Sequence, residues 1–202
     1  MTRLNVNPTR MELKKLKARL ATATRGHKLL KDKSDEMVRQ FTGLVKRNMK
    51  LREEVEKELS FTLRDFSVAR SVTPVYRAET AFSLPVSSVT AECETGCIMG
   101  VDIPKITVKG KAGKGLPYAY SEMTSEADAA VEKAGELLPK MIELAQTEKT
   151  VRLLAAEIER NKRRVNALEY VMIPQLEETI AYIKGKLDEN ERAAIIRLMK
   201  VK

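Results

Sequence analysis

Apolar side chains recur along the first third of the chain in alternating steps of three and four residues. These steps reach thirteen positions between Leu13 and Val55, and the polar members of the series are isolated. Such a heptad pattern is typical of a coiled coil, so residues 1–66 are predicted to form a long helix that Asn7-Pro8 can start. The thirteen positions are Leu13, Leu16, Leu20, Ala23, His27, Leu30, Ser34, Met37, Phe41, Leu44, Asn48, Leu51 and Val55.

A second apolar stripe runs through residues 121–202, which are predicted to form a C-terminal helix. Ser121 or Thr124 can cap its start, and Pro139 is expected to kink or restart it. Near Pro174 the stripe changes to successive steps of four, a stutter that unwinds a supercoil locally. The stripe consists of Met141, Leu144, Val151, Ile158, Val165, Leu168, Met172, Leu176, Ile180, Ile183, Leu187, Ile195 and Leu198.

The middle of the chain, residues 67–120, has a different composition, with four of the seven prolines and most of the glycines. Alternating apolar and polar residues predict a β-hairpin at about 88–103, turning at Glu94-Thr95-Gly96, which "KITVK" can extend. The expected hairpin residues are Val89, Cys93, Cys97 and Val101. A basic Gly-rich loop at 110–115 lacks the Lys-Ser/Thr pair of a phosphate-binding loop, because Leu116-Pro117 follows its second glycine.

The two long helices each carry one narrow apolar stripe and are not expected to be stable alone. Pairing them antiparallel buries both stripes and brings the two termini to the same end. The sequence therefore predicts a mainly α fold: a long antiparallel two-helix coiled coil with a small middle region that contains a β-hairpin.

Gly26-His27 interrupts the first stripe with a poor helix former and the chain's single histidine. In the predicted pairing His27 faces the region of Leu176, opposite Ile173-Pro174-Gln175. We interpret Gly26, His27, Asn48 and Pro174 as seam residues that set the register. Catalysis by His27 is disfavoured, because a base needs a pocket and an orienting partner.

The net charge of +9 is concentrated at the start of the chain, where residues 1–50 hold 14 Lys/Arg and 4 Asp/Glu. Such a surface suits nucleic acid, anionic lipid or an acidic protein cavity, or simply solvation. The alternative function left open is a basic coiled-coil adaptor for nucleic acid or an anionic surface. Aromatic residues make up only 4% and no nucleic-acid motif occurs, so no nucleic-acid partner is predicted. An enzyme, a cofactor site and a metal site are also not predicted.

Cys93 and Cys97 form a single C-x3-C pair without a nearby histidine. This spacing favours two reduced, partly buried thiols over a metal or redox site. No apolar run approaches the length of a membrane span, and the N-terminus lacks the apolar core of a signal peptide. We therefore expect a cytoplasmic protein with no direct membrane insertion.

Two blocks of the sequence carry a resemblance to a known family. These blocks are "LNVNPTRMELKKLKARLATATRGHKLLKDKSDEMVRQF" and "ERNKRRVNALEYVMIPQLEETIAYIKGKLDENERAAIIRLMKVK". Both closely resemble the D subunit of the V-type rotary ATPases, and the long helices between them agree with that family. The variable middle region matches it only weakly.

The resemblance implies a central rotor shaft that performs no bond chemistry and binds no cofactor. Its termini would enter the catalytic ring of A and B subunits, and its other end would join the F subunit and the membrane-rotor collar subunit. The shaft would couple ATP hydrolysis or synthesis to proton or sodium transport, peripheral to the membrane.

The same resemblance suggests which residues meet these partners. Basic residues at the paired termini are expected to contact the catalytic ring: Arg3, Arg10, Lys14, Lys17, Arg192, Arg197 and Lys200. Leu4, Val6, Ile195 and Leu198 would give this end an apolar surface. The hairpin is expected to contact the F subunit or to modulate ATP hydrolysis.

Overall fold

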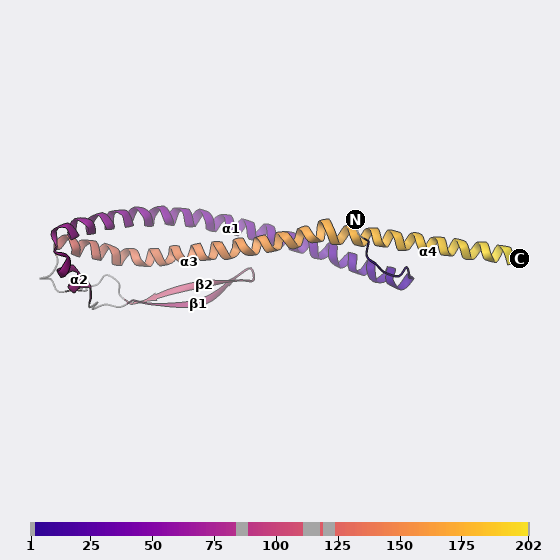
Figure 1. The fold of residues 1–202 in the computed structure, drawn as a ribbon, viewed down its shortest axis with the longest axis horizontal. Coiled ribbons are helices and arrows are strands. Elements are labelled where there is room, and N and C mark those ends of the chain that lie inside the picture. Colours follow the sequence, from indigo (N-terminus) through magenta and orange to yellow (C-terminus); the bar gives the residue numbers. More distant parts are fainter. Residues whose placement is uncertain (1–2, 84–88, 111–117, 119–123, 202) are drawn as a thin grey trace. The chain divides into compact units, whose positions relative to one another are not determined.

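The computed structural model describes residues 3–83, 89–110, 118 and 124–201 (Figure 1). The predicted mainly α fold, with two long helices packed together and an antiparallel hairpin, is confirmed. The chain forms two compact units, Met1–Val38 with Glu157–Lys202, and Arg39–Ala156. Its elements are α1 (Arg10–Val72), α2 (Val75–Ser83), β1 (Thr90–Ile98), β2 (Val101–Lys109), α3 (Ser125–Ala167), the π-helical η1 (Leu168–Met172) and α4 (Ile173–Val201).

Helix α1 begins at Arg10 rather than at Asn7-Pro8, because Thr9 supplies the cap. Thr9 Oγ1 accepts a hydrogen bond of 3.2 Å from the backbone N–H of Glu12. This Thr-x-x-Glu spacing satisfies one of the free N–H groups at a helix start. The preceding residues turn, with Thr9 N–H donating to the Asn7 carbonyl at 2.9 Å.

The predicted heptad stripe is the face of α1 that lies away from solvent. All thirteen predicted positions are buried or half-buried. In the first unit, Leu16, Leu176 and Ile183 are nearly inaccessible and form a core cluster, against which Leu13, Leu20, Ala23, Ile180 and Leu187 pack. The second stripe is less regular, since Met141, Met172, Ile195 and Leu198 are exposed.

The start of α1 lies beside the later part of α4, at the end of the helix pair where both termini were predicted. The N-terminal segment runs back along α4, where the Leu4 N–H donates to Thr179 Oγ1 at 3.2 Å. Arg10, the first residue of α1, pairs with Glu191, so the part of α4 after Glu191 extends beyond the start of α1 (Figure 1). From Thr179 to the end of α4 the helix runs for about 30 Å.

The stutter near Pro174 takes the form of the π turn η1. The N–H of Ile173 donates to the carbonyl of Leu168, five residues earlier. Pro174 has no N–H and its ring clashes with the carbonyl four residues before it, and a π bond over the preceding turn accommodates both effects. Helix α3, in contrast, continues through Pro139 without a restart.

The second unit pairs the later part of α1 with α3 in antiparallel fashion. Ion pairs join Arg47 to Glu143 at 2.6 Å and Lys133 to Asp65 at 2.7 Å. The short helix α2 was not predicted. The Phe82 ring on α2 contacts Phe66 on α1 and Tyr118, with ring centroids 6.2 and 5.5 Å apart.

The hairpin exists, but its predicted turn at Glu94-Thr95-Gly96 is wrong. These residues lie within β1, where Thr95 pairs with Pro104 and Gly96 with Ile103. The turn is Met99-Gly100, with φ of 53° and 85°. Two successive left-handed residues match the twist of the flanking strands, and "KITVK" belongs to β2 as expected.

Two sequence predictions lie outside the described residues. The basic loop at 110–115 is described only at Gly110, and Ser121 is not described. At the start of α3, the Thr124 carbonyl accepts hydrogen bonds from the N–H groups of Ala127 and Asp128.

Candidate functional site

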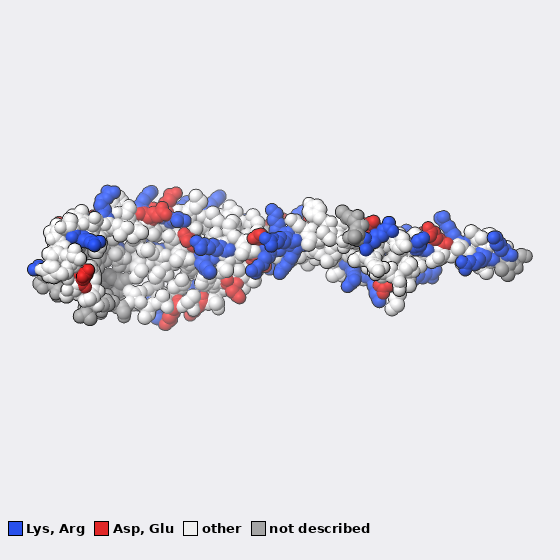
Figure 2. Space-filling model, viewed as in Figure 1, with Lys and Arg blue, Asp and Glu red and all other residues white. Residues whose placement is uncertain are grey.

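The last turns of α4 form an accessible surface of apolar and basic side chains. Ile195, Ile196, Leu198 and Met199 are between 52% and 72% exposed, and Arg192, Arg197 and Lys200 are exposed beside them. Figure 2 shows Lys and Arg side chains gathered over this end of α4. Large exposed apolar side chains that are contiguous mark a contact surface. We call this segment, Arg192–Lys200, the α4 tip.

The basic residues of the N-terminal arm lie elsewhere on the first unit. Arg3 Nε is 3.4 Å from Glu178 Oε1, and the Arg3 guanidinium lies 4.8 Å from the centre of the Tyr182 ring. Lys14 and Lys17 are exposed near the start of α1. The structure thus places Arg3 beside the first third of α4, away from the α4 tip.

Leu4 and Val6 also lie away from the α4 tip. Leu4 stands next to Thr179 and lines a groove with Leu176, while Val6 is half-buried in the same N-terminal segment. The apolar character of the tip therefore comes from α4 alone among the described residues.

His27 contacts the π turn. Its Nε2 atom is 3.3 Å from Glu169 Oε2, and its side chain is 18% exposed. This partner lies about two helical turns before the predicted level of Leu176, so the predicted facing of His27 was wrong. Gly26 is half-buried, and nothing lies within 4 Å of where its Cβ would be. A need for close backbone approach therefore does not explain this glycine.

Two further seam residues, Asn48 and Asn161, bring polar atoms into the helix interface. Asn48 Oδ1 is buried and accepts no hydrogen bond from the described residues. Asn161 is almost inaccessible, and its Nδ2 lies 3.8 Å from the sulfur of Met37. Buried polar atoms with weak or missing partners reduce stability while they restrict register.

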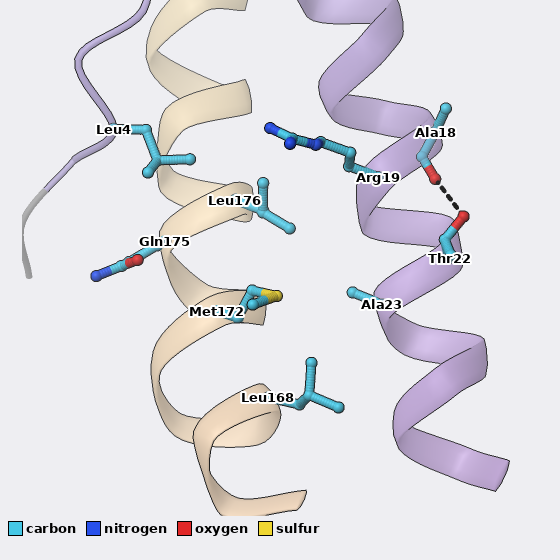
Figure 3. A pocket seen from close by; sticks show the side chains of 9 residues that line it. All are labelled: Leu4, Ala18, Arg19, Thr22, Ala23, Leu168, Met172, Gln175 and Leu176. Atoms are coloured by element: carbon cyan, nitrogen blue, oxygen red, sulfur yellow. Dashed lines mark hydrogen bonds between the residues drawn. The ribbon is translucent and has the colours of Figure 1, made fainter. Parts of the chain in front are cut away.

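A groove of about 560 Å³ lies between α1, η1 and the first turn of α4 (Figure 3). We call it the α1–η1 groove. Its walls are mainly apolar: Leu168, Met172 and Leu176 project from one helix toward Ala23 on the other. Arg19 extends from α1 toward the other helix, and Leu4 and Gln175 belong to the lining as well (Figure 3). Small α1 residues opposite a widened π turn leave the space unfilled.

The expected hairpin residues lie in or next to the hairpin, but the two cysteines are not partly buried as predicted. Val89 precedes β1, and Val101 pairs with Ile98 at the turn. Cys93 and Cys97 are free and exposed, so the prediction of partly buried thiols was wrong. Four residues of one strand span about 13 Å, too far for a disulfide between them.

Tyr118 is a strongly perturbed titratable group among the described residues of the second unit. Burial raises the pKa of Tyr118 well above its ordinary value, and the hydrogen bond that its hydroxyl donates to Asp128 at 2.8 Å adds to the effect. The hairpin is attached to α3 in the same unit, because the Ile106 N–H donates to Gln146 Oε1 at 3.0 Å.

The described residues offer contact surfaces. Among them, no cluster of three or more His, Cys, Asp or Glu side chains is placed to hold a metal ion. No helix in the part of the chain that the structure describes has the length and apolarity needed to cross a membrane. The exposed features described above are the α4 tip, the α1–η1 groove and the hairpin.

Sequence reasoning missed the α1–η1 groove and the exposure of Tyr170, Val171 and Met172, which are 50% to 64% accessible. The available sequence signal was the spacing of four residues between successive apolar positions around Met172. They indicated a local unwinding, but the width of the turn depends on which backbone hydrogen bonds form.

A family model and the sequences of known proteins both match this chain over nearly its whole length. The family model for the D subunit of ATP synthase matches residues 12–202. The chain is similar to the V-type ATP synthase D subunit of Clostridium botulinum (strain ATCC 19397 / Type A), with 52% identity over 204 residues covering 99% of this chain and 94% of the relative. Similarity to the protein of the same name from Clostridium novyi (strain NT) is 52% over 206 residues, covering 100% and 95%.

Proposed function

Because this chain belongs to the family of ATP synthase D subunits, we propose that it is the central rotor shaft of a V-type rotary ATPase. In this role it transmits torque between the catalytic ring of A and B subunits and the membrane rotor ring. The chain performs no bond chemistry itself. It couples ATP hydrolysis or synthesis in the ring to proton or sodium transport, at the periphery of the membrane.

The observation that supports this function most directly is the α4 tip. A shaft that turns inside a ring needs an end that makes many weak contacts, since one strong contact would stop rotation. The tip carries three cations, Arg192, Arg197 and Lys200, among exposed apolar side chains. Exposed ion pairs contribute only about 0.2–1 kcal/mol each, which suits a surface that must be released at each step.

The coupling of shaft rotation to ATP hydrolysis or synthesis follows from the asymmetric surface of the shaft. A shaft whose faces differ contacts the catalytic interfaces unequally, and each interface then has a different preferred conformation. The difference in contact free energy between states is what couples rotation to nucleotide binding and release. Unequal faces are present in the first unit, where the N-terminal segment lies against α4 near Thr179 and Glu178.

The partners follow from the same role. The α4 tip, together with Lys14, Lys17 and Arg10 near the start of α1, would contact the A and B subunits. The hairpin β1–β2 would contact the F subunit or modulate ATP hydrolysis, and the membrane-rotor collar subunit would bind the end of the shaft outside the ring. Deleting Thr90–Lys109 tests the hairpin, and normal binding of the F subunit with normal hydrolysis would count against its role.

The experiment for the whole proposal is reconstitution with the A and B subunits of the same organism. The native chain should co-purify with the ring, and the triple variant Arg192→Gln, Arg197→Gln, Lys200→Gln should bind about tenfold more weakly. The matched control is a second triple variant, in which the exposed Lys46, Lys50 and Lys57 are changed to Gln. Failure of the native chain to bind the ring, or salt-sensitive binding to nucleic acid instead, would refute the proposed function.

A further inference from the structure

Strand β1 has one edge that pairs with β2 and one edge that the described residues leave open. The Ile106 N–H on β2 donates to Gln146 Oε1 on α3 instead of to β1, and Ile106 lies opposite Cys93. In an antiparallel ladder such a pair directs the backbone groups of both residues away from the partner strand, and pairs of this kind alternate with hydrogen-bonded pairs. We call the open side the free edge of β1, and it presents the backbone groups of Ala91, Cys93, Thr95 and Cys97.

The residues that normally block a sheet edge are on the other strand. Lysine and proline prevent an edge from pairing with another chain, and β2 carries Pro104, Lys105 and Lys109. Strand β2 also contacts α3 through Gln146. Strand β1 contains neither lysine nor proline, seven of its nine residues are exposed, and it pairs with β2 without a bulge. Its free edge is therefore suited to accept a further strand.

The side chains of β1 indicate what such a strand carries. Residues directly opposite each other share one face of a sheet, and Glu92 and Glu94 lie opposite Lys109 and Lys105. Lys109 Nζ pairs with Glu92 at 2.6 Å, whereas Glu94 forms no ion pair with a described residue. Both lysines lie on the β2 side, so carboxylates alone border the free edge on this face. On the other face the β1 side chains are small and uncharged, and the charged side chain of β2 there is Asp102.

We propose that the free edge of β1 accepts an extended segment of a neighbouring subunit as a third strand. The segment alternates basic and apolar residues, so that its cations lie beside Glu92 and Glu94 and its apolar side chains cover the small residues of the other face. The proposal rests on the proposed function, in which the hairpin contacts other subunits of the ATPase. A second copy of β1 is a poor occupant, because it carries carboxylates and no cation.

Residue-resolved hydrogen exchange tests strand addition in the complex with the A, B and F subunits. In the free chain the free-edge amides of β1 should exchange faster than the intervening amides, which donate to β2. In the complex this difference should disappear, because both sets of amides then donate to a strand. A difference that persists in the complex would overturn the proposal.

A matched pair of proline variants separates the two edges of the hairpin. Cys93→Pro removes an N–H from the free edge without removing a hydrogen bond to β2, and Val108→Pro does the same on the outer edge of β2. The probe is a synthetic peptide of alternating lysine and valine, whose binding to the full chain is followed by NMR. Cys93→Pro should weaken this binding about tenfold and Val108→Pro less than about twofold. Equal effects, or no effect of Cys93→Pro, would contradict the proposal.

The charge preference has its own test. A peptide in which glutamate replaces lysine should bind about tenfold more weakly than the lysine peptide, and Glu94→Gln should weaken binding of the lysine peptide about threefold. Equal binding of the two peptides would refute the basic character of the segment.

The outcomes separate strand addition from the proposed function. If the native chain does not assemble with the A, B and F subunits, the proposed function fails. If it assembles and the exchange pattern of β1 is unchanged, only strand addition fails. A dimer of the free chain that Cys93→Pro abolishes, measured by light scattering, would show that a second copy occupies the free edge and would overturn the proposal.

Discussion

Asn48 is the residue whose replacement should most clearly stabilise the protein. It occupies a seam position of α1 in the second unit, and its Oδ1 atom is buried without a hydrogen-bond donor among the described residues. A buried acceptor without a partner costs about 1–3 kcal/mol. In Asn48→Leu this cost disappears, and partial burial of the larger apolar side chain contributes about 1 kcal/mol more. Repacking of the half-buried seam offsets about 1 kcal/mol of the gain.

The expected net result for Asn48→Leu is a free energy of unfolding that is higher by about 1–3 kcal/mol. For a chain of this size a gain of about 2 kcal/mol raises the Tm by about 4–8 °C. Urea unfolding followed by far-UV circular dichroism measures the free energy, and an unchanged m value would show that the same surface is exposed on unfolding.

The isosteric variant Asn48→Asp is the matched control. It keeps the shape of the side chain but places an ionised carboxylate where one neutral oxygen already lacks a donor, so it should destabilise the protein at neutral pH. The reasoning would be refuted if Asn48→Leu were less stable than the native protein, or if Asn48→Asp were as stable as Asn48→Leu. Either result would mean that this oxygen has a partner in solution.

Three further changes have defined expectations. His27→Leu should keep or raise the Tm, since His27 occupies a seam position; retained stability together with lost ring binding would contradict a purely structural role. Tyr118→Phe removes the hydrogen bond to Asp128 and should lower the free energy of unfolding by about 1–2 kcal/mol. Because the folded pKa of Tyr118 is raised, its stabilisation is complete below the unfolded pKa near 10 and is lost at higher pH. Stability of the native protein should therefore fall more steeply than that of Tyr118→Phe in alkaline urea titrations. Gln146→Leu removes the acceptor for a β2 amide and should increase hydrogen exchange in the hairpin without changing exchange in α1; unchanged hairpin exchange would show that this bond does not hold it.

The hairpin turn illustrates why local sequence patterns were not enough to place the turn between the two strands. The sequence around Gly96 reads as a break, and Met99-Gly100 carries no typical turn signal such as Asn-Gly. The strands pair from Thr90 with Lys109 to Ile98 with Val101, so the residues predicted to form the turn are paired within β1. Strand pairing is decided by cross-strand contacts and register, which a local window does not contain.

The pairing of the helices shows the same limit at larger scale. A heptad stripe predicts which face of a helix is buried, but not which residue of the partner helix lies opposite a given position. Shifting one helix along the other by a whole repeat buries a similar apolar area. His27 contacts Glu169, seven residues before the predicted level of Leu176, and Glu169 lies in the π turn Leu168–Met172. The apolar stripe continues through this turn and does not by itself fix which residue His27 faces.

The sequence alone was enough to determine the long helices, their buried face and the family, because periodic apolar positions and two long matching blocks are properties of the order of residues. The tertiary structure alone decided the register, the path of the N-terminal segment along α4, the exposure of Cys93 and Cys97, and the α1–η1 groove. These depend on contacts between residues far apart in the chain. In particular, the groove exists because a π turn in one helix lies opposite small side chains in the other, which a reading of either helix separately does not reveal.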